Sequence, residues 1–130
     1  MNLHTLPLSD LLHPTLLLQI RTGQDLSQSI QIPALIDTGF DGYLSVPVYF
    51  AQELNLEILG ETEVELANGQ QYTVKIALLR IEFDKYLIEV ETILGEDQEA
   101  LIGTSLLNQI SDKFILNFKE RQIELLVKDL

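Results

Sequence analysis

Short apolar segments, broken at intervals by turn residues, restrict the fold of this chain more than any other feature of its sequence. The clearest break is Asn68-Gly69, which separates two stretches of alternating apolar and polar residues. Both residues of an Asn-Gly pair accept the positive φ angles of a tight turn, so the sequence predicts a β-hairpin here. Similar segments recur from residue 15 to the end of the chain, and they predict a β-rich domain.

The other expected strands lie at 15–22, 29–36, 43–46, 86–94, 100–103, 113–118 and 123–127. Two short helical patterns interrupt them. One begins at Pro47, which suits the first turn of a helix, and the other covers 104–111, with Thr104 or Ser105 as the candidate N-cap. The strands are too numerous for one flat sheet. A closed or strongly curved all-β structure would protect the sheet edges, so a barrel is expected.

The composition is that of one globular domain. The chain has 130 residues, of which 46% are hydrophobic, enough for a single packed core. We expect one domain over residues 15–130, preceded by a segment, 1–14, whose position the sequence leaves open. The chain has no cysteine, which excludes disulfides, thiolate metal ligands and a cysteine nucleophile.

Charge narrows the range of partners. Twenty acidic residues against eight basic ones give a net charge of −12, which argues against nucleic acid and against acidic membranes as partners. The first 20 residues contain neither a basic leader nor a long apolar run, so a cytoplasmic protein is expected. His4 and His13 have no ligand cluster around them, and no nucleotide-binding loop is present. No metal and no cofactor is therefore expected.

The stretch that raises a chemical question is Ala34-Leu35-Ile36 running directly into Asp37-Thr38-Gly39. An apolar strand heads for the interior, yet a buried ionised carboxylate is unfavourable unless it is paired. Asp37 therefore lies either in a turn, where its side chain caps a backbone amide, or in a site that uses a carboxylate. The residues alone leave both interpretations open.

A carboxylate site of this kind requires two acids. Two carboxylates about 3 Å apart cannot both be ionised, so they share a proton and titrate as a coupled pair. One then acts as general base on a water molecule while the other protonates a substrate carbonyl. The chain contains a single Asp-Thr-Gly. It is therefore either a turn without catalytic function or half of a symmetric dimer.

Taken in order, these features resemble the retropepsin-like aspartic proteases, and the small cellular and prokaryotic-type members more than the viral ones. The resemblance is carried by Asp37-Thr38-Gly39, the Asn-Gly hairpin, Ile102-Gly103 and a short helix followed by a terminal hairpin, over about residues 15–127. It implies a closed β-barrel with one or two short helices.

The resemblance also implies roles at matching positions. Asp37 would be the catalytic carboxylate, and Thr38 and Gly39 would support the active-site loop. Substrate would be bound by Phe40 and Asp41 and by the hairpin tip, and Ile102 and Gly103 would form the loop under the catalytic turn. The residues of the tip are Ala67, Asn68, Gly69 and Gln70.

Three functions follow as hypotheses. The first is a homodimeric aspartic endopeptidase that cleaves peptide or protein substrates. The second is a dimeric peptide-binding module of the same fold without proteolysis, suggested by Phe40 where viral members have a small residue and by Thr104 where they have Arg. The third is a monomeric barrel that binds a small apolar ligand.

Overall fold

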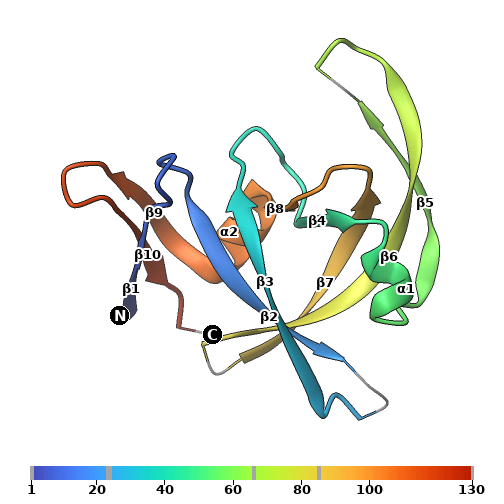
Figure 1. Cartoon of the computed structure of the whole chain (residues 1–130), viewed down its shortest axis with the longest axis horizontal. Helices are drawn as coiled ribbons and strands as arrows, with labels where there is room; N and C mark the ends of the chain where they lie inside the picture. Colours follow the sequence, from blue (N-terminus) through green and yellow to red (C-terminus); the bar gives the residue numbers. More distant parts are fainter. Residues whose placement is uncertain (1, 23–24, 66, 85, 130) are drawn as a thin grey trace.

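The computed structural model describes residues 2–22, 25–65, 67–84 and 86–129, which form ten strands and two short helices (Figure 1). The strands are β1 (Asn2–Pro7), β2 (Thr15–Thr22), β3 (Gln28–Ile36), β4 (Leu44–Pro47), β5 (Ile58–Glu65), β6 (Gln71–Phe83), β7 (Tyr86–Gly95), β8 (Ala100–Ile102), β9 (Ser111–Asn117) and β10 (Gln122–Val127). The helices are α1 (Phe50–Glu53) and α2 (Thr104–Ile110).

Six strands close into a barrel. They are hydrogen-bonded in the order β2-β3-β8-β4-β7-β6, and β6 pairs back onto β2 to complete the ring. Most neighbours are antiparallel, but β3 runs parallel to β8, and β4 runs parallel to β7. The closed all-β barrel with short helices that the sequence predicted is thus confirmed.

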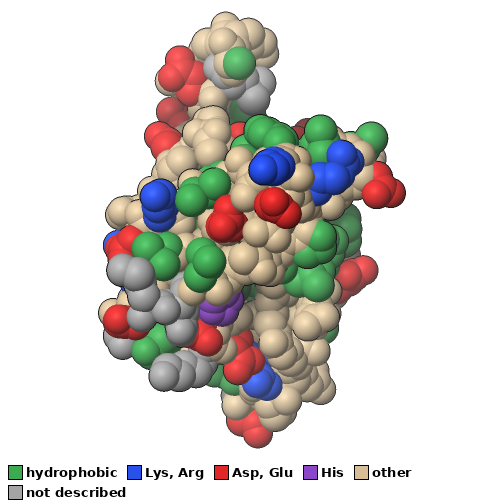
Figure 2. All heavy atoms as spheres, turned by 90° about the vertical axis from the view of Figure 1, so that its left-hand side faces the viewer, with side chains coloured by type: hydrophobic (Ala, Val, Ile, Leu, Met, Phe, Trp, Pro, Cys, Tyr) green, Lys and Arg blue, Asp and Glu red, His purple; other side chains and the backbone are tan. Residues whose placement is uncertain are grey.

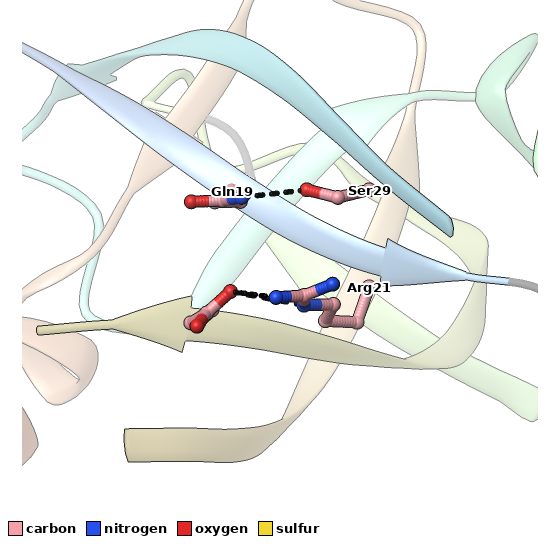
Figure 3. Close-up of polar contacts among 4 residues, drawn as sticks. Gln19, Arg21 and Ser29 are labelled. Carbon is pink, nitrogen blue, oxygen red and sulfur yellow. Dashed lines mark hydrogen bonds and ion pairs between the residues drawn. The ribbon is translucent and has the colours of Figure 1, made fainter. Parts of the chain in front are cut away.

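Polar contacts reinforce the seam where the barrel closes (Figure 3). Only Gln19, Ile20 and Arg21 of β2 pair with β6. The side chain of Arg21 adds an ion pair to β6, with 2.7 Å between Arg21 Nη2 and Glu82 Oε2. On the other side of β2, Gln19 Nε2 donates a hydrogen bond to Ser29 Oγ of β3 at 2.8 Å. These side chains hold three strands together at a place where the ladder is short.

Alternation along the strands places the core inside the barrel. In β3, for example, Ile32, Ala34 and Ile36 are buried while Pro33 is exposed, because successive side chains of a strand point to opposite faces. Every buried side-chain nitrogen or oxygen of the described residues has a hydrogen-bond partner. The interior is therefore apolar with its few polar groups satisfied.

A second, three-stranded sheet lies beside the barrel in the order β1-β10-β9. The N-terminal segment, whose position the sequence left open, supplies β1, which pairs antiparallel with β10 along its whole length. Helix α2 links this sheet to the barrel, and its Leu106, Leu107 and Ile110 are buried in the common core. Within the described residues, β1 and β9 each keep one edge without a strand partner.

The predicted hairpin around Asn68-Gly69 is present and consists of β5 and β6. Its strands end at Glu65 and resume at Gln71, so the connection is longer than a two-residue turn. The hairpin projects beyond the rest of the molecule in both views (Figures 1 and 2). It stands at the same end of the barrel as the connection between β3 and β4 (Figure 1).

The helices differ in detail from the sequence prediction. Pro47 is the last residue of β4, where it pairs with Gly95, and α1 begins only at Phe50. The N-cap of α2 is Gly103, and no side chain caps this helix, so the expected cap at Thr104 or Ser105 is wrong. Neither of the described helices has the length and apolar character that crossing a membrane requires.

Candidate active site

Asp37 occupies the position where β3 leaves the barrel. Its backbone N–H donates to Ile102 O of β8 at 2.9 Å, which prolongs the β3–β8 pairing by one residue. Its carbonyl accepts from Phe40 N at 3.1 Å, and the chain turns immediately afterwards. The apolar strand thus brings the Asp37 backbone to the barrel wall, while its side chain stays half-buried. This arrangement resolves the apparent conflict between the buried strand and the charged residue.

The Asp37 carboxylate is fixed by its own turn. Oδ1 accepts a hydrogen bond from the Gly39 N–H at 2.9 Å, which is the amide cap that one interpretation of the sequence predicted. A Cβ at Gly39 would lie 3.2 Å from the same oxygen, so glycine lets the amide approach the carboxylate closely. No cation pairs with Asp37 within the part of the chain that the structure describes. A capped carboxylate is compatible with either interpretation.

The connection from β8 to α2 is hydrogen-bonded to the segment that follows Asp37. Gly103 N donates to Tyr43 O at 3.0 Å, Thr104 N to Phe40 O at 2.9 Å, and Ser105 N to Gly42 O at 3.1 Å. Two segments about 60 residues apart in the sequence are therefore joined by a continuous set of backbone hydrogen bonds. Ile102 and Gly103 thus contact the segment that follows β3 through backbone hydrogen bonds, and the role in an active site that the resemblance implied for them stays a prediction.

The two hydroxyl groups at the start of α2 also serve this junction. Ser105 Oγ donates to Asp41 O at 2.5 Å, and Thr104 Oγ1 makes a longer contact with Phe40 O at 3.5 Å. The sequence suggested these residues as helix caps, because Ser and Thr before an apolar helical pattern usually cap it. Their real partners lie on a distant loop, so local sequence gave no signal for this role.

The remaining predicted site residues of this turn have fewer contacts. Thr38 and Asp41 are exposed, and no ion pair involves Asp41 within the described residues. Phe40 is half-buried, and its ring lies over the backbone of Gly42, where a Cβ would come within 2.6 Å of two ring atoms. Phe40 thus fills the space between the two loops, and Gly42 is a residue of the junction that sequence reasoning missed.

The predicted tip residues are exposed at the end of the β5–β6 hairpin. Asn68 Oδ1 accepts from Gln70 N at 2.9 Å, and Gly69 has φ of +82°, a conformation that glycine adopts without strain. Ala67 belongs to the same turn. No hydrogen bond joins these four residues to the Asp37 turn in the described structure. The hairpin extends away from the barrel (Figure 1).

No group of three or more His, Asp or Glu side chains lies close enough to hold a metal ion among the residues that the structure describes. At Asp37 the structure shows a carboxylate that accepts a hydrogen bond from the Gly39 backbone amide.

Known structures share this architecture. A retropepsin-like aspartic protease from Rickettsia conorii superposes with a TM-score of 0.65, covering 95% of this chain and 90% of that protein at 15% sequence identity. The EIAV protease, solved with the inhibitor HBY-793, gives 0.59 over 75% of this chain and 86% of its own, at 16% identity. The simian foamy virus (mac) protease gives 0.50, with 72% and 91% coverage and 15% identity.

These similarities define the class of fold. The chain has the fold of the retropepsin-like aspartic proteases, as the sequence resemblance implied. Comparison of the sequence with models of protein families and with curated proteins gives no match. At identities of 15–16% the structural likeness defines the fold alone, because one fold can carry different functions.

Proposed function

We propose that this protein is an aspartic endopeptidase that acts as a homodimer, with one Asp37 from each chain. The observation that carries the proposal is the place of Asp37 in a retropepsin-like barrel. The single Asp-Thr-Gly lies at the end of a buried strand, and the β8–α2 junction holds it in place through Ile102 and Gly103. A rigid support of this kind is what a reacting carboxylate requires.

The proposed mechanism uses the two carboxyl groups with one shared proton. The ionised Asp37 takes a proton from a water molecule, whose oxygen forms a bond to the carbonyl carbon of the peptide. The protonated Asp37 of the second chain gives its proton to the carbonyl oxygen. In the second step the first Asp37 gives its proton to the amide nitrogen, a hydroxyl proton of the tetrahedral intermediate passes to the ionised Asp37 of the second chain, and the C–N bond breaks to leave an acid and an amine. Activity should therefore have a bell-shaped pH dependence.

The other site residues have proposed roles around this centre. Thr38 is exposed in one chain and would make its hydrogen bonds with the second chain across the two-fold axis. Gly39 keeps the turn open for the substrate backbone. Phe40 and Asp41 would contact the peptide from the same loop, and the hairpin tip at Asn68-Gly69 would close over it as a flap. The peptide would lie extended between the flap and this loop.

The terminal sheet supports the proposed dimer. Strand β9 has an unpaired edge within the described structure, and Ile115, Leu116 and Phe118 at or just beyond it are exposed, Phe118 to 59%. Hydrophobic side chains mix with charged ones over this side of the molecule (Figure 2). An open edge strand with apolar neighbours favours pairing with a second chain. The partners we propose are thus a second copy and a peptide or protein substrate, in the cytoplasm, without nucleic acid or membrane.

One observation favours a second candidate, the dimeric peptide-binding module without proteolysis. Among the described residues Asp41 has no cationic partner, and the Phe40 ring packs over Gly42 in the loop that would bind the substrate. Such a protein would bind apolar peptides as a dimer and release them uncut.

Cleavage of a mixed peptide library over about pH 4 to 7 separates the two candidates. Wild type should yield products by mass spectrometry, and Asp37→Asn should yield none. An Asn side chain keeps an oxygen that can accept a hydrogen bond from the Gly39 N–H. We therefore expect the free energy of unfolding of the variant to lie within about 1 kcal/mol of that of wild type. Equal cleavage by both proteins would refute the protease, and binding without products from a dimer would favour the module.

A further inference from the structure

A cavity of about 510 Å³ lies on the outer face of β3, directly upstream of Asp37. Ile32, Pro33 and Leu35 of β3 line it, while Ala34 and Ile36 of the same strand are buried in the barrel core. Because side chains alternate along a strand, Leu35 and Asp37 project to the same side, about 7 Å apart. Leu35 is therefore the lining residue nearest along the strand to the candidate catalytic carboxylate, and the volume of the cavity lies within the range of ligand sites.

The walls come from three separate parts of the chain. The loop from Ser9 to His13 closes on itself, with Leu12 N donating to Ser9 O at 2.8 Å and His13 N donating to Ser9 Oγ at 2.9 Å. It is fastened to β3 because Ile36 N donates to Pro14 O at 2.8 Å. These hydrogen bonds give this wall a defined shape.

Aromatic side chains provide the second wall. Tyr49 and Phe50, at the start of α1, line the cavity, and their ring centroids are 4.7 Å apart. With Pro33 and Leu35 they form an apolar part of the lining. Aromatic rings also attract a cation placed near their faces.

Acidic side chains line the same cavity. Asp10 belongs to the N-terminal loop, and Glu99 is the residue before β8. Neither carboxylate forms an ion pair or a hydrogen bond in the described structure. Glu96 and Asp97 add two further acids to the loop that carries Glu99. His13 is the one basic side chain of the lining, because no Lys or Arg is among the described residues that surround the cavity.

We propose that this cavity binds a long basic side chain of the substrate, lysine or arginine, and so determines which peptides the protein accepts. The aliphatic stem would lie against Leu35, Pro33 and the Tyr49–Phe50 pair, and the charged head would meet Asp10 and Glu99. Long basic side chains bury an apolar stem while keeping their charge near water, which matches a cavity with apolar walls and acidic groups. The inference rests on the proposed peptide substrate.

The position of the cavity fixes where the basic residue stands in the peptide. An extended peptide advances about 3.3 Å per residue and its side chains alternate. Leu35 lies about 7 Å along the strand from Asp37, so the cavity that it lines would receive a side chain within about three residues of the cleaved bond. In a symmetric dimer the second copy of the cavity would act on the other side of that bond.

The test uses peptides that differ at one position near the cleavage site, which holds lysine, arginine or norleucine. Cleavage by wild type is compared with cleavage by Glu99→Gln, Asp10→Asn and the double variant. Binding of the same peptides, labelled with a fluorophore, is measured by anisotropy on Asp37→Asn, which keeps the cavity. Glu91→Gln is the matched control, because Glu91 is exposed on β7 and lies outside this cavity.

We expect lysine and arginine peptides to be preferred over norleucine, and each single variant to reduce that preference about threefold to fivefold. The double variant should remove it, Glu91→Gln should keep it, and added salt should weaken it. Cleavage with no basic preference, or with a preference that survives in the double variant, would overturn the inference and leave the protease intact. Glu99-dependent binding of lysine peptides without any cleavage would support the cavity and refute the protease. Neither cleavage nor preferential binding would refute both.

Discussion

Gly103 and Gly42 touch backbone to backbone, although 60 residues separate them. A Cβ at Gly103 would overlap the carbonyl group of Gly42 and come within 2.9 Å of the Phe40 ring. The loop that carries Asp37 and the loop that starts α2 can therefore approach only because Gly103 lacks a side chain, and the absence of one at Gly42 makes room for the Phe40 ring. The geometry of the candidate active site depends on this contact.

Gly103→Ala should therefore destabilise the protein by about 1–3 kcal/mol, because the two loops must separate to accommodate a methyl group. Urea unfolding gives the free energy change. Gly60→Ala is the control, because nothing lies within 4 Å of a Cβ there, and it should change stability by less than about 0.5 kcal/mol. Equal effects of the two substitutions would contradict the contact.

The hydroxyl of Ser105 gives a second prediction for the same junction. Ser105→Ala removes a 2.5 Å hydrogen bond to the Asp41 carbonyl and should cost about 0.5–1.5 kcal/mol of unfolding free energy. Thr104→Ala removes only a 3.5 Å contact with Phe40 O, which is too long for a strong hydrogen bond, and should cost less. The opposite ranking in thermal or urea unfolding would show that Ser105 does not support the turn.

We expect the two ion pairs of the barrel to differ in how much they stabilise the protein. Arg21–Glu82 is short, at 2.7 Å, and both side chains are about 30% exposed, whereas Arg80–Glu89 spans 3.1 Å and Glu89 is 59% exposed. Double-mutant cycles should give a coupling energy near 1 kcal/mol for the first pair and near zero for the second. The first value should fall at high salt. A coupling energy near zero for Arg21–Glu82 would show that the seam gains no stability from this ion pair.

A substitution in β9 tests whether its open edge is the interface of the proposed dimer. Ile115→Lys places a charge beside the open edge, and two copies would bring like charges together there. Sedimentation should show a shift from dimer to monomer, with an unchanged far-UV spectrum and loss of peptide cleavage. Leu59→Lys, at an exposed position of β5, is the control and should remain a dimer. A dimer that tolerates Ile115→Lys would place the interface elsewhere.

Several features of the fold follow from local sequence alone. Alternation of apolar and polar residues defines most of the strands and predicts which side chains enter the core, since the period of a strand is a local property. Asn68-Gly69 places the hairpin, because φ near +82° at Gly69 suits glycine. The tripeptide at Asp37 marks the end of a buried strand. The order of these features was sufficient to suggest the barrel, which the structure confirms.

Contacts between distant segments were decided only by the tertiary structure. The sequence could not show that β1 pairs with β10, because nothing in the short segment at the N-terminus indicates which strand is its partner. Nor could it assign the hydroxyls of Thr104 and Ser105 to a loop 64 residues away, since the same residues serve equally as helix caps. Asp10, Leu35, Tyr49 and Glu99 line one cavity because β3, β8 and α1 meet in space. Such meetings depend on strand order and register, which arise from packing of the whole chain rather than from any single stretch of it.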